Sequence, residues 1–195
     1  MQGYSARYEA ALVLATRAHR DQVRKGSDIP YVTHVFHVSA ILLRYSFPED
    51  VAIAGLLHDV VEDQDIPLSR IESDFGPVVA EMVKALSEKK MEDGQIRPWQ
   101  VRKQELLDQL RNASPETAAI KAADTLHNSR RLAADLRREG PHIWQFFSRG
   151  PQQSLWYYGS VVAIVREHLG AHPLTDELAA AVQDLERAIA ESGGA

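Results

Sequence analysis

The sequence predicts an all-α fold of roughly ten helices, and three observations support this prediction. Apolar residues recur every three to four positions through most of the chain, which is the spacing of helices that bury one face. Proline stands near the start of several such segments, at Pro48, Pro77 and Pro115, where its fixed φ favours the first helical turn. No segment alternates apolar and polar residues in the way that is typical of a half-buried strand.

The expected helices follow one another with short connections. They span residues 4–23, 31–45, 48–61, 67–75, 77–86, 99–111, 116–138, 143–147, 152–169 and 175–191. Glu49 and Asp50 complement the dipole at the start of the third helix, and Gly76 separates the fourth from the fifth. Ser114 is a typical N-cap residue for the seventh helix, and Gly140 marks its end.

Residues 87–98 form the one long polar segment that lacks helical periodicity. A loop of this length in a compact domain is usually either functional or disordered. The chain shows no internal repeat and no change of composition that would mark a domain boundary. We therefore expect a single domain over residues 1–195.

Composition and charge exclude several classes of function. The 195 residues include no cysteine, which excludes a disulfide framework, a thiolate metal site and a cysteine nucleophile. The net charge of -5 does not favour nonspecific nucleic-acid binding, so we expect no nucleic-acid partner. No apolar run is long enough to span a bilayer, and no signal pattern is visible at the start of the sequence. We expect a cytoplasmic protein with no membrane partner.

An adjacent histidine and aspartate, His58 and Asp59, lie where the apolar pattern places the core. An ionised carboxylate in a core needs a compensating cation or a hydrogen-bond network, and a divalent metal would meet that need. His34 and Asp124 complete a set of four ligands with this pair. Two imidazoles and two carboxylates suit Mn, Fe, Zn, Ni or Co, and they leave coordination positions open, as in a catalytic site.

A second pair of carboxylates, Glu62 and Asp63, follows the histidine and aspartate by one helical turn. Residues four apart lie on one face of a continuous helix, so we expect His58 to stack over Glu62 and Asp59 over Asp63. A metal in this cavity would activate water and polarise a phosphoryl oxygen. Glu62 and Asp63 are therefore the predicted catalytic pair that orients or deprotonates the water.

Polar residues near the predicted ligands suggest a small anionic substrate. Asn128 and Arg131 follow Asp124 by about one and two turns, and Arg24 and Lys25 lie in the polar loop that precedes His34. Amide and guanidinium groups suit the oxygens of a phosphate, and an arginine can contact them in bidentate fashion. We expect these four residues to bind substrate.

The three motifs together resemble those of HD-domain phosphohydrolases, and more closely those of the hydrolase domain of RelA/SpoT enzymes. The resemblance rests on residues 23–34, residues 58–63 and residues 121–130, and it covers roughly residues 4–169. It implies a helical HD-domain bundle with one divalent ion per chain, most commonly Mn²⁺. It also implies hydrolysis of the 3′-pyrophosphate of guanosine tetra- or pentaphosphate (ppGpp or pppGpp), giving GDP or GTP and pyrophosphate. The small-molecule partner would thus be a guanine nucleotide.

The resemblance has departures, and other functions stay open. Thr125 stands where the family commonly has a long basic residue, and Val35 stands where it often has proline, which leaves the substrate less defined than the chemistry. Another nucleotide is an alternative substrate: a ppApp-type alarmone, a dNTP, a nucleoside monophosphate or NADPH. A non-catalytic HD binding module is a further alternative. The oligomeric state is not determined by the sequence, and a homo-oligomer remains open.

Some nearby residues are interpreted as structural. The aromatic run at 156–158 has helical spacing and is expected to pack in the core. His19 and His127 have no companions with the spacing of ligands. We expect His127 to point away from the metal site, although it is close to Asp124 in sequence.

Overall fold

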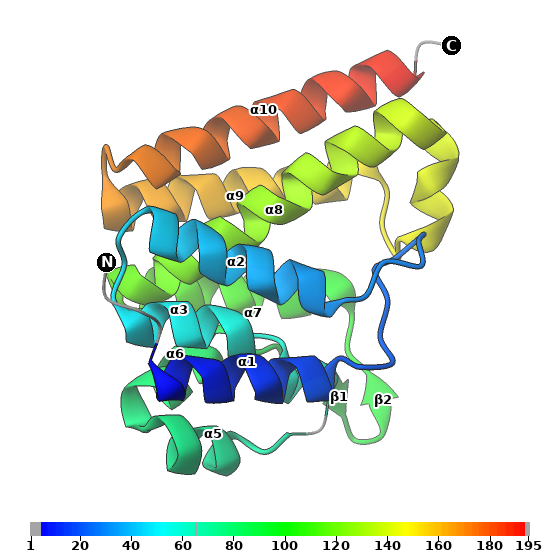
Figure 1. Ribbon diagram of the computed structural model, residues 1–195. Helices are drawn as coiled ribbons and strands as arrows, with labels where there is room; N and C mark the ends of the chain where they lie inside the picture. Colours follow the sequence, from blue (N-terminus) through cyan, green and yellow to red (C-terminus); the bar gives the residue numbers. More distant parts are fainter. Residues whose placement is uncertain (1–4, 65, 194–195) are drawn as a thin grey trace.

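The computed structural model describes residues 5–64 and 66–193, and this part of the chain is built almost entirely of helices (Figure 1). In chain order they are α1 (Ala6–Ala18), α2 (Val32–Arg44), α3 (Glu49–Leu57), α4 (Val60–Asp63), α5 (Leu68–Phe75), α6 (Pro77–Leu86), α7 (Trp99–Arg111), α8 (Pro115–Glu139), the 3₁₀ helix η1 (Pro141–Phe146), α9 (Pro151–Leu169) and α10 (Pro173–Gly193). The all-α prediction is confirmed. Within the described residues, no helix combines the length and apolar character needed to cross a membrane.

Helix α3 lies at the centre of the core. All seven residues from Val51 to Leu57 are buried, so most of the helix has no solvent-facing side. A helix that is apolar all round is stable in water only where other elements cover it. Helices α1, α2, α6 and α8 all pack against α3. The two residues that follow it, His58 and Asp59, therefore begin from a helix that lies in the protein interior.

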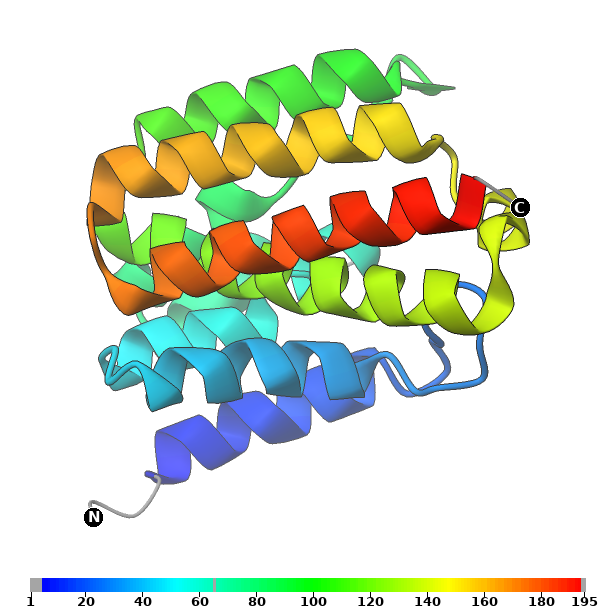
Figure 2. The ribbon, with the colours of Figure 1, turned by 90° about the horizontal axis from the view of Figure 1, so that it is seen from above.

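Helices α8, α9 and α10 lie side by side next to this core (Figure 2). Ser114 caps α8 by accepting the backbone N–H of Thr117 at 3.2 Å, as the sequence predicts. Gly140 ends α8 with φ of 74°, a conformation that residues with a Cβ rarely adopt. Asp124 lies near the middle of this 25-residue helix, where both neighbouring turns hold it in place.

The prediction of one continuous helix over residues 48–61 is wrong. Helix α3 ends at Leu57, His58 and Asp59 form a turn, and α4 begins at Val60. Periodicity could not locate this break, because α3 is apolar on every side up to Leu57. The stacking of His58 over Glu62 and of Asp59 over Asp63 stays a prediction, and the backbone N–H of Asp63 still donates to the carbonyl oxygen of Asp59 at 2.9 Å.

The first helix is also shorter than predicted, ending at Ala18 and not at residue 23. Residues 19–31 turn back on themselves through an antiparallel bridge between Val23 and Pro30. Gly26 has φ of 69° in this loop, and a Cβ built there would lie 2.9 Å from Cδ2 of Phe146. The loop is thus packed closely on η1, which holds its basic residues in a defined position.

The predicted loop over 87–98 contains a short β-hairpin, which the sequence analysis did not predict. Strands β1 (Met91–Glu92) and β2 (Gln95–Ile96) pair antiparallel. Asp93 and Gly94 form the turn between them, with φ of 48° and 76°. Two successive positive φ angles are typical of the type I′ turn, for which Asp-Gly is a preferred sequence. That dipeptide was the available indication, and the strands are too short to show an alternating pattern.

Replacing Gly55 with alanine is expected to destabilise the protein. A Cβ at this position in α3 would lie 2.7 Å from Cδ1 of Leu42, which is itself fully buried in α2. Overpacking of this kind typically costs about 1–3 kcal/mol. The melting temperature should fall by roughly 2–4 °C per kcal/mol in a chain of this size. The matched control is Gly159→Ala in α9, where a Cβ meets no atom within 4 Å. An unchanged melting temperature for Gly55→Ala would contradict the close packing of α2 on α3.

Candidate metal centre

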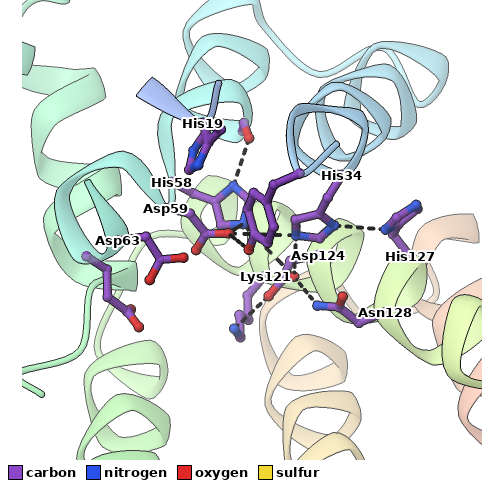
Figure 3. Close-up of polar contacts among 12 residues, drawn as sticks. His19, His34, His58, Asp59, Asp63, Lys121, Asp124, His127 and Asn128 are labelled. Carbon is purple, nitrogen blue, oxygen red and sulfur yellow. Dashed lines mark hydrogen bonds and ion pairs between the residues drawn. The ribbon is translucent and has the colours of Figure 1, made fainter. Parts of the chain in front are cut away.

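Four predicted ligands converge from three parts of the chain (Figure 3). His34 comes from α2, His58 and Asp59 from the turn after α3, and Asp124 from α8. His34 Nε2 lies 3.2 Å from Asp124 Oδ1 and 3.8 Å from Asp59 Oδ2, and His58 Nε2 lies 3.1 Å from Asp59 Oδ2. Potential ligand atoms of His34, His58 and Asp59 all lie within 4.8 Å of one another. This spacing suits ligands around one ion.

The two imidazoles present free nitrogens to this centre. Nε2 of His34 and Nε2 of His58 are buried, and neither makes a hydrogen bond. His58 donates from Nδ1 to the carbonyl oxygen of Gly55 at 2.8 Å, so its Nε2 is the nitrogen left to coordinate. Buried polar atoms without partners are rare in native proteins. A divalent metal would give both nitrogens a partner, and the donor set therefore fits such an ion.

The electrostatics of the centre also favour positive charge. Burial opposes ionisation of Asp124, but the Lys121 ammonium and both histidines outweigh it and hold the pKa of Asp124 well below its usual value. Burial likewise opposes protonation of His58, yet the carboxylates of Asp59 and Asp124 raise its pKa to about 9. Two ionised carboxylates in one buried place make a site for a cation.

Other side chains fix the orientation of the two aspartates. Tyr31 donates from its hydroxyl to Asp59 Oδ2 at 2.6 Å. Asp124 accepts from Lys121 Nζ at 2.7 Å and from Asn128 Nδ2 at 2.6 Å, one on each carboxylate oxygen. Partners of this kind hold metal ligands in place. Lys121 and Asn128 precede and follow Asp124 by one turn of α8.

The carboxylates of Glu62 and Asp63 lie beside the centre on the short helix α4. Glu62 Oε2 accepts the backbone N–H of Glu88 at 3.1 Å, and Glu62 Oε1 lies 3.1 Å from Lys90 Nζ. Asp63 accepts from Lys90 Nζ at 2.5 Å and from Gln22 Nε2 at 3.1 Å. Burial, with the Glu88 carboxylate nearby, raises the pKa of Glu62. The segment after α6 is therefore ordered against this pair through Lys90.

Comparison with known proteins identifies the family. The HD domain family matches residues 11–151 of the chain. This protein belongs to the HD domain family. All four residues of the centre lie inside the matched range.

Curated relatives are similar to this chain over most of its length. The chain is 34% identical over 147 residues to the human guanosine-3′,5′-bis(diphosphate) 3′-pyrophosphohydrolase MESH1, covering 74% of this chain and 77% of the relative. It is 36% identical over 143 residues to MESH1 of Drosophila melanogaster, covering 72% and 75%. It is 36% identical over 132 residues to a GTP pyrophosphokinase of Streptomyces coelicolor, where the match covers 67% of this chain but only 15% of that enzyme.

The fold agrees with solved structures. A structure described as a metazoan ortholog of SpoT that hydrolyses ppGpp superimposes with a TM-score of 0.73 at 28% identity, covering 97% of this chain and 99% of that chain. A Listeria monocytogenes protein gives a TM-score of 0.69 at 33% identity, covering 77% and 96%. The HD domain match ends at residue 151, so α10 and most of α9 lie beyond it.

A cavity of about 560 Å³ opens beside the metal centre of this HD domain. Every predicted site residue except His34 lines it: Arg24, Lys25, His58, Asp59, Glu62, Asp63, Asp124, Asn128 and Arg131. The exception is buried behind the centre, with a relative exposure of 0%. The cavity is therefore continuous with the candidate ligands and large enough for a nucleotide-sized molecule.

The predicted substrate contacts adopt different arrangements around this cavity. Arg24 donates to Asn128 Oδ1 at 2.5 Å, so the loop residue reaches across to α8. Lys25 lies on the surface at the cavity wall, with its ammonium 5.6 Å from the ring of Phe147. Arg131 lines the cavity but donates from Nε to Asp135 at 2.6 Å.

Sequence reasoning missed several residues that line the cavity. They are Tyr31, Lys103, Lys121, Arg149 and Tyr157 among others. Tyr157 is buried, as the packing interpretation predicts, whereas the prediction is wrong for Trp156, which is exposed. Tyr157 also faces this cavity, with Lys103 Nζ 4.6 Å from its ring centroid. Lys121 could have been found, because it lies three residues before Asp124 on the same helix. Lys103 comes from α7 and Tyr157 from α9, whose packing the sequence does not specify, while Tyr31 and Arg149 lie in the segments just before α2 and α9.

Two histidines interpreted as uninvolved lie close to the HD domain centre, and the prediction that His127 points away is wrong. Nδ1 of His127 lies 2.8 Å from Nδ1 of His34. Burial and the nearby His34 lower the pKa of His127 to about 3. His19 is fully buried beside Tyr31 and bonds through Nδ1 to Gln22, which in turn donates to Asp63.

Proposed function

We propose that this protein is a metal-dependent pyrophosphohydrolase that removes the 3′-pyrophosphate of guanosine tetra- or pentaphosphate. The products would be pyrophosphate with GDP or GTP. The observation that carries the proposal is the buried centre of His34, His58, Asp59 and Asp124, which opens directly onto a cation-lined cavity of nucleotide size. The similarity to MESH1 enzymes over three quarters of their length supports the choice of substrate.

Metal binding in the proposal involves one divalent ion per chain, held by those four residues, with Mn²⁺ as the preferred ion. When bound, it would polarise the scissile phosphoryl group and lower the pKa of water. The protein's own side chains would then accept the proton of the attacking water and bind the charged phosphate groups. The proposal includes a single domain, a small-molecule partner and no nucleic-acid partner. A cytoplasmic location is also part of the proposal.

The reaction adds water across one phosphorus–oxygen bond. The water oxygen bonds to the phosphorus attached to the ribose 3′ oxygen, and the bond between that phosphorus and the 3′ oxygen breaks. Glu62 accepts a proton from the attacking water, because its raised pKa and its position beside the centre suit a general base. The leaving 3′ oxygen takes up a proton, which gives a free hydroxyl. Asp63, held by Lys90 and Gln22, orients the water.

Charge at the other side of the cavity would bind the phosphates. Arg24, Lys25, Lys103 and Arg149 line it, and guanidinium and ammonium groups pair with phosphate oxygens. Arg24 also donates to Asn128, which in turn donates to Asp124, so two successive hydrogen bonds link the substrate loop to the candidate metal ligand. This arrangement would place the scissile phosphate next to the metal.

Replacing Arg24 with alanine is expected to weaken substrate binding more than it slows chemistry. A charge-assisted hydrogen bond contributes about 1.5–3 kcal/mol, so KM should rise by roughly 10- to 100-fold. Steady-state kinetics of Arg24→Ala measures this, with Arg70→Ala as the control, since Arg70 forms an ion pair with Asp74 on α5 and does not line the cavity. An unchanged KM for Arg24→Ala would contradict the phosphate role.

The test of the function is a turnover assay with Mn²⁺ on ppGpp, ppApp, GTP, dGTP and NADPH, with chromatographic separation of products. Release of pyrophosphate and GDP from ppGpp is the expected result, and EDTA should abolish it. If only another of these nucleotides is hydrolysed, the proposed metal-dependent chemistry is retained and the proposed substrate is wrong. No turnover of any of them by metal-loaded protein would favour a non-catalytic HD binding module.

A further inference from the structure

His127, on α8, lies directly behind the metal ligand His34 (Figure 3). Their Nδ1 atoms are 2.8 Å apart, and their ring centroids are 4.9 Å apart with planes tilted by 40°. The contact is on the side of His34 opposite to its free Nε2, which faces the centre. Every other histidine or carboxylate contact of His34 described above is made through that Nε2.

A hydrogen bond between two Nδ1 atoms fixes both tautomers. One nitrogen must carry a proton and donate it, and the other must be bare and accept it. A neutral imidazole that coordinates through Nε2 keeps its proton on Nδ1, so His34 is the donor. His127 is therefore the acceptor, with its own proton on Nε2. The reverse assignment would place a proton on His34 Nε2, where it would block coordination.

The ring of His127 is itself held in place by α2. His37, one turn after His34, stacks on His127 with centroids 4.9 Å apart and planes only 19° apart. His37 is fixed in turn by donating from Nδ1 to the carbonyl oxygen of Thr33 at 2.6 Å. His127 thus lies between two rings of α2, one that it bonds and one that it stacks on. This leaves its Nδ1 aimed at His34.

We infer that His127 is a positioning residue that fixes the tautomer and ring orientation of His34, so that His34 Nε2 faces the metal. The inference rests on the proposed metal centre and assigns a role to a residue outside the four ligands. Most ligating histidines donate to a carboxylate, a carbonyl or water. His58 follows that rule by donating to the Gly55 carbonyl. His34 instead donates to a neutral imidazole, which orients it without adding a further negative charge to the site.

The test is metal affinity, measured by calorimetric titration of the EDTA-treated full chain with Mn²⁺ and with Zn²⁺. His127→Phe keeps a ring in the stack but removes the acceptor, and its Kd is expected to rise by about 10- to 100-fold. His127→Asn can place its Oδ1 near the former Nδ1, so it should restore most of the affinity. His37→Phe is the matched control, because it changes the stack without touching the hydrogen bond, and its Kd should stay at the wild-type value.

An unchanged Kd for His127→Phe would overturn the inference, and equal losses in His127→Phe and His37→Phe would reduce His127 to a packing role. If His127→Phe does not fold, nitrogen-15 NMR of the wild-type protein loaded with Zn²⁺ decides the matter. A proton on His34 Nδ1 and a bare His127 Nδ1 are expected, and the opposite tautomers would overturn the inference. Wild-type protein that binds neither metal would instead refute the proposed function itself, which separates the two failures.

Discussion

Replacing Asp59 with alanine is expected to remove bound metal and hydrolytic activity together. Asp59 Oδ2 lies 3.1 Å from His58 Nε2 and 3.8 Å from His34 Nε2, so its loss leaves two imidazoles without the carboxylate that offsets the charge of the cation. Lewis-acid stabilisation by a catalytic metal amounts to several kcal/mol. Turnover should therefore fall by about 10³-fold or more. Elemental analysis of the purified variant and its kcat measure the two effects.

A matched control removes a different aspartate. Asp184 lies on the surface of α10 and pairs with Arg137 at 2.8 Å, away from the centre, so Asp184→Ala should keep both metal and activity. Circular dichroism of Asp59→Ala should show the wild-type helical content. Full metal content in a folded Asp59→Ala variant would contradict the assignment of Asp59 as a ligand. Full activity without metal would contradict the metal requirement.

Replacing Glu62 with glutamine is expected to preserve metal binding and to abolish most turnover. Glutamine has nearly the same shape but cannot accept the proton of the attacking water. General-base catalysis contributes about 10²- to 10⁴-fold, and kcat should fall by that factor. Because burial and Glu88 raise the pKa of Glu62, the wild-type rate should decline as pH falls through a value above the ordinary 4.5 of glutamate. The pH profile of Glu62→Gln should lack this decline.

Two further variants sharpen this result. Glu92→Gln, on the exposed hairpin, should leave kcat unchanged, since Glu92 pairs with Lys89 and Arg97 outside the cavity. Asp63→Asn tests the partner carboxylate. Loss of turnover in Asp63→Asn, with full turnover in Glu62→Gln, would transfer the general-base role to Asp63. Both variants must retain metal, because a change in metal content would obscure the assignment.

The helices and the four candidate ligands could be predicted from the sequence for different reasons. Helical periodicity and the positions of proline and glycine are local properties, so α6 and α7 begin and end at the predicted residues. The placement of His34, His58, Asp59 and Asp124 came from chemistry, since polar groups within an apolar pattern must find a partner. The structure brings the four together as that argument expects. Their role as ligands stays a prediction until metal is measured.

What the sequence did not reveal depends on contacts between elements. The break between α3 and α4 follows a helix that is apolar on all sides, so the periodicity of α3 has no polar face from which its end could be detected. The position of His127 depends on how α8 packs on α2, and no local pattern records that packing. The same is true of Lys103 and Tyr157, which reach the cavity from α7 and α9.

The origin of the ligands in three separate segments has a thermodynamic consequence. His34, the His58–Asp59 turn and Asp124 are brought together only when α2, α3 and α8 are packed, so the unfolded chain has no comparable site. Ligand binding that is restricted to the folded state shifts the folding equilibrium, by about 2.7 kcal/mol when the free ion is at 100 times its Kd. Metal supply would then set the lifetime of the folded protein as well as its activity, and starvation for the ion would favour unfolding and proteolysis.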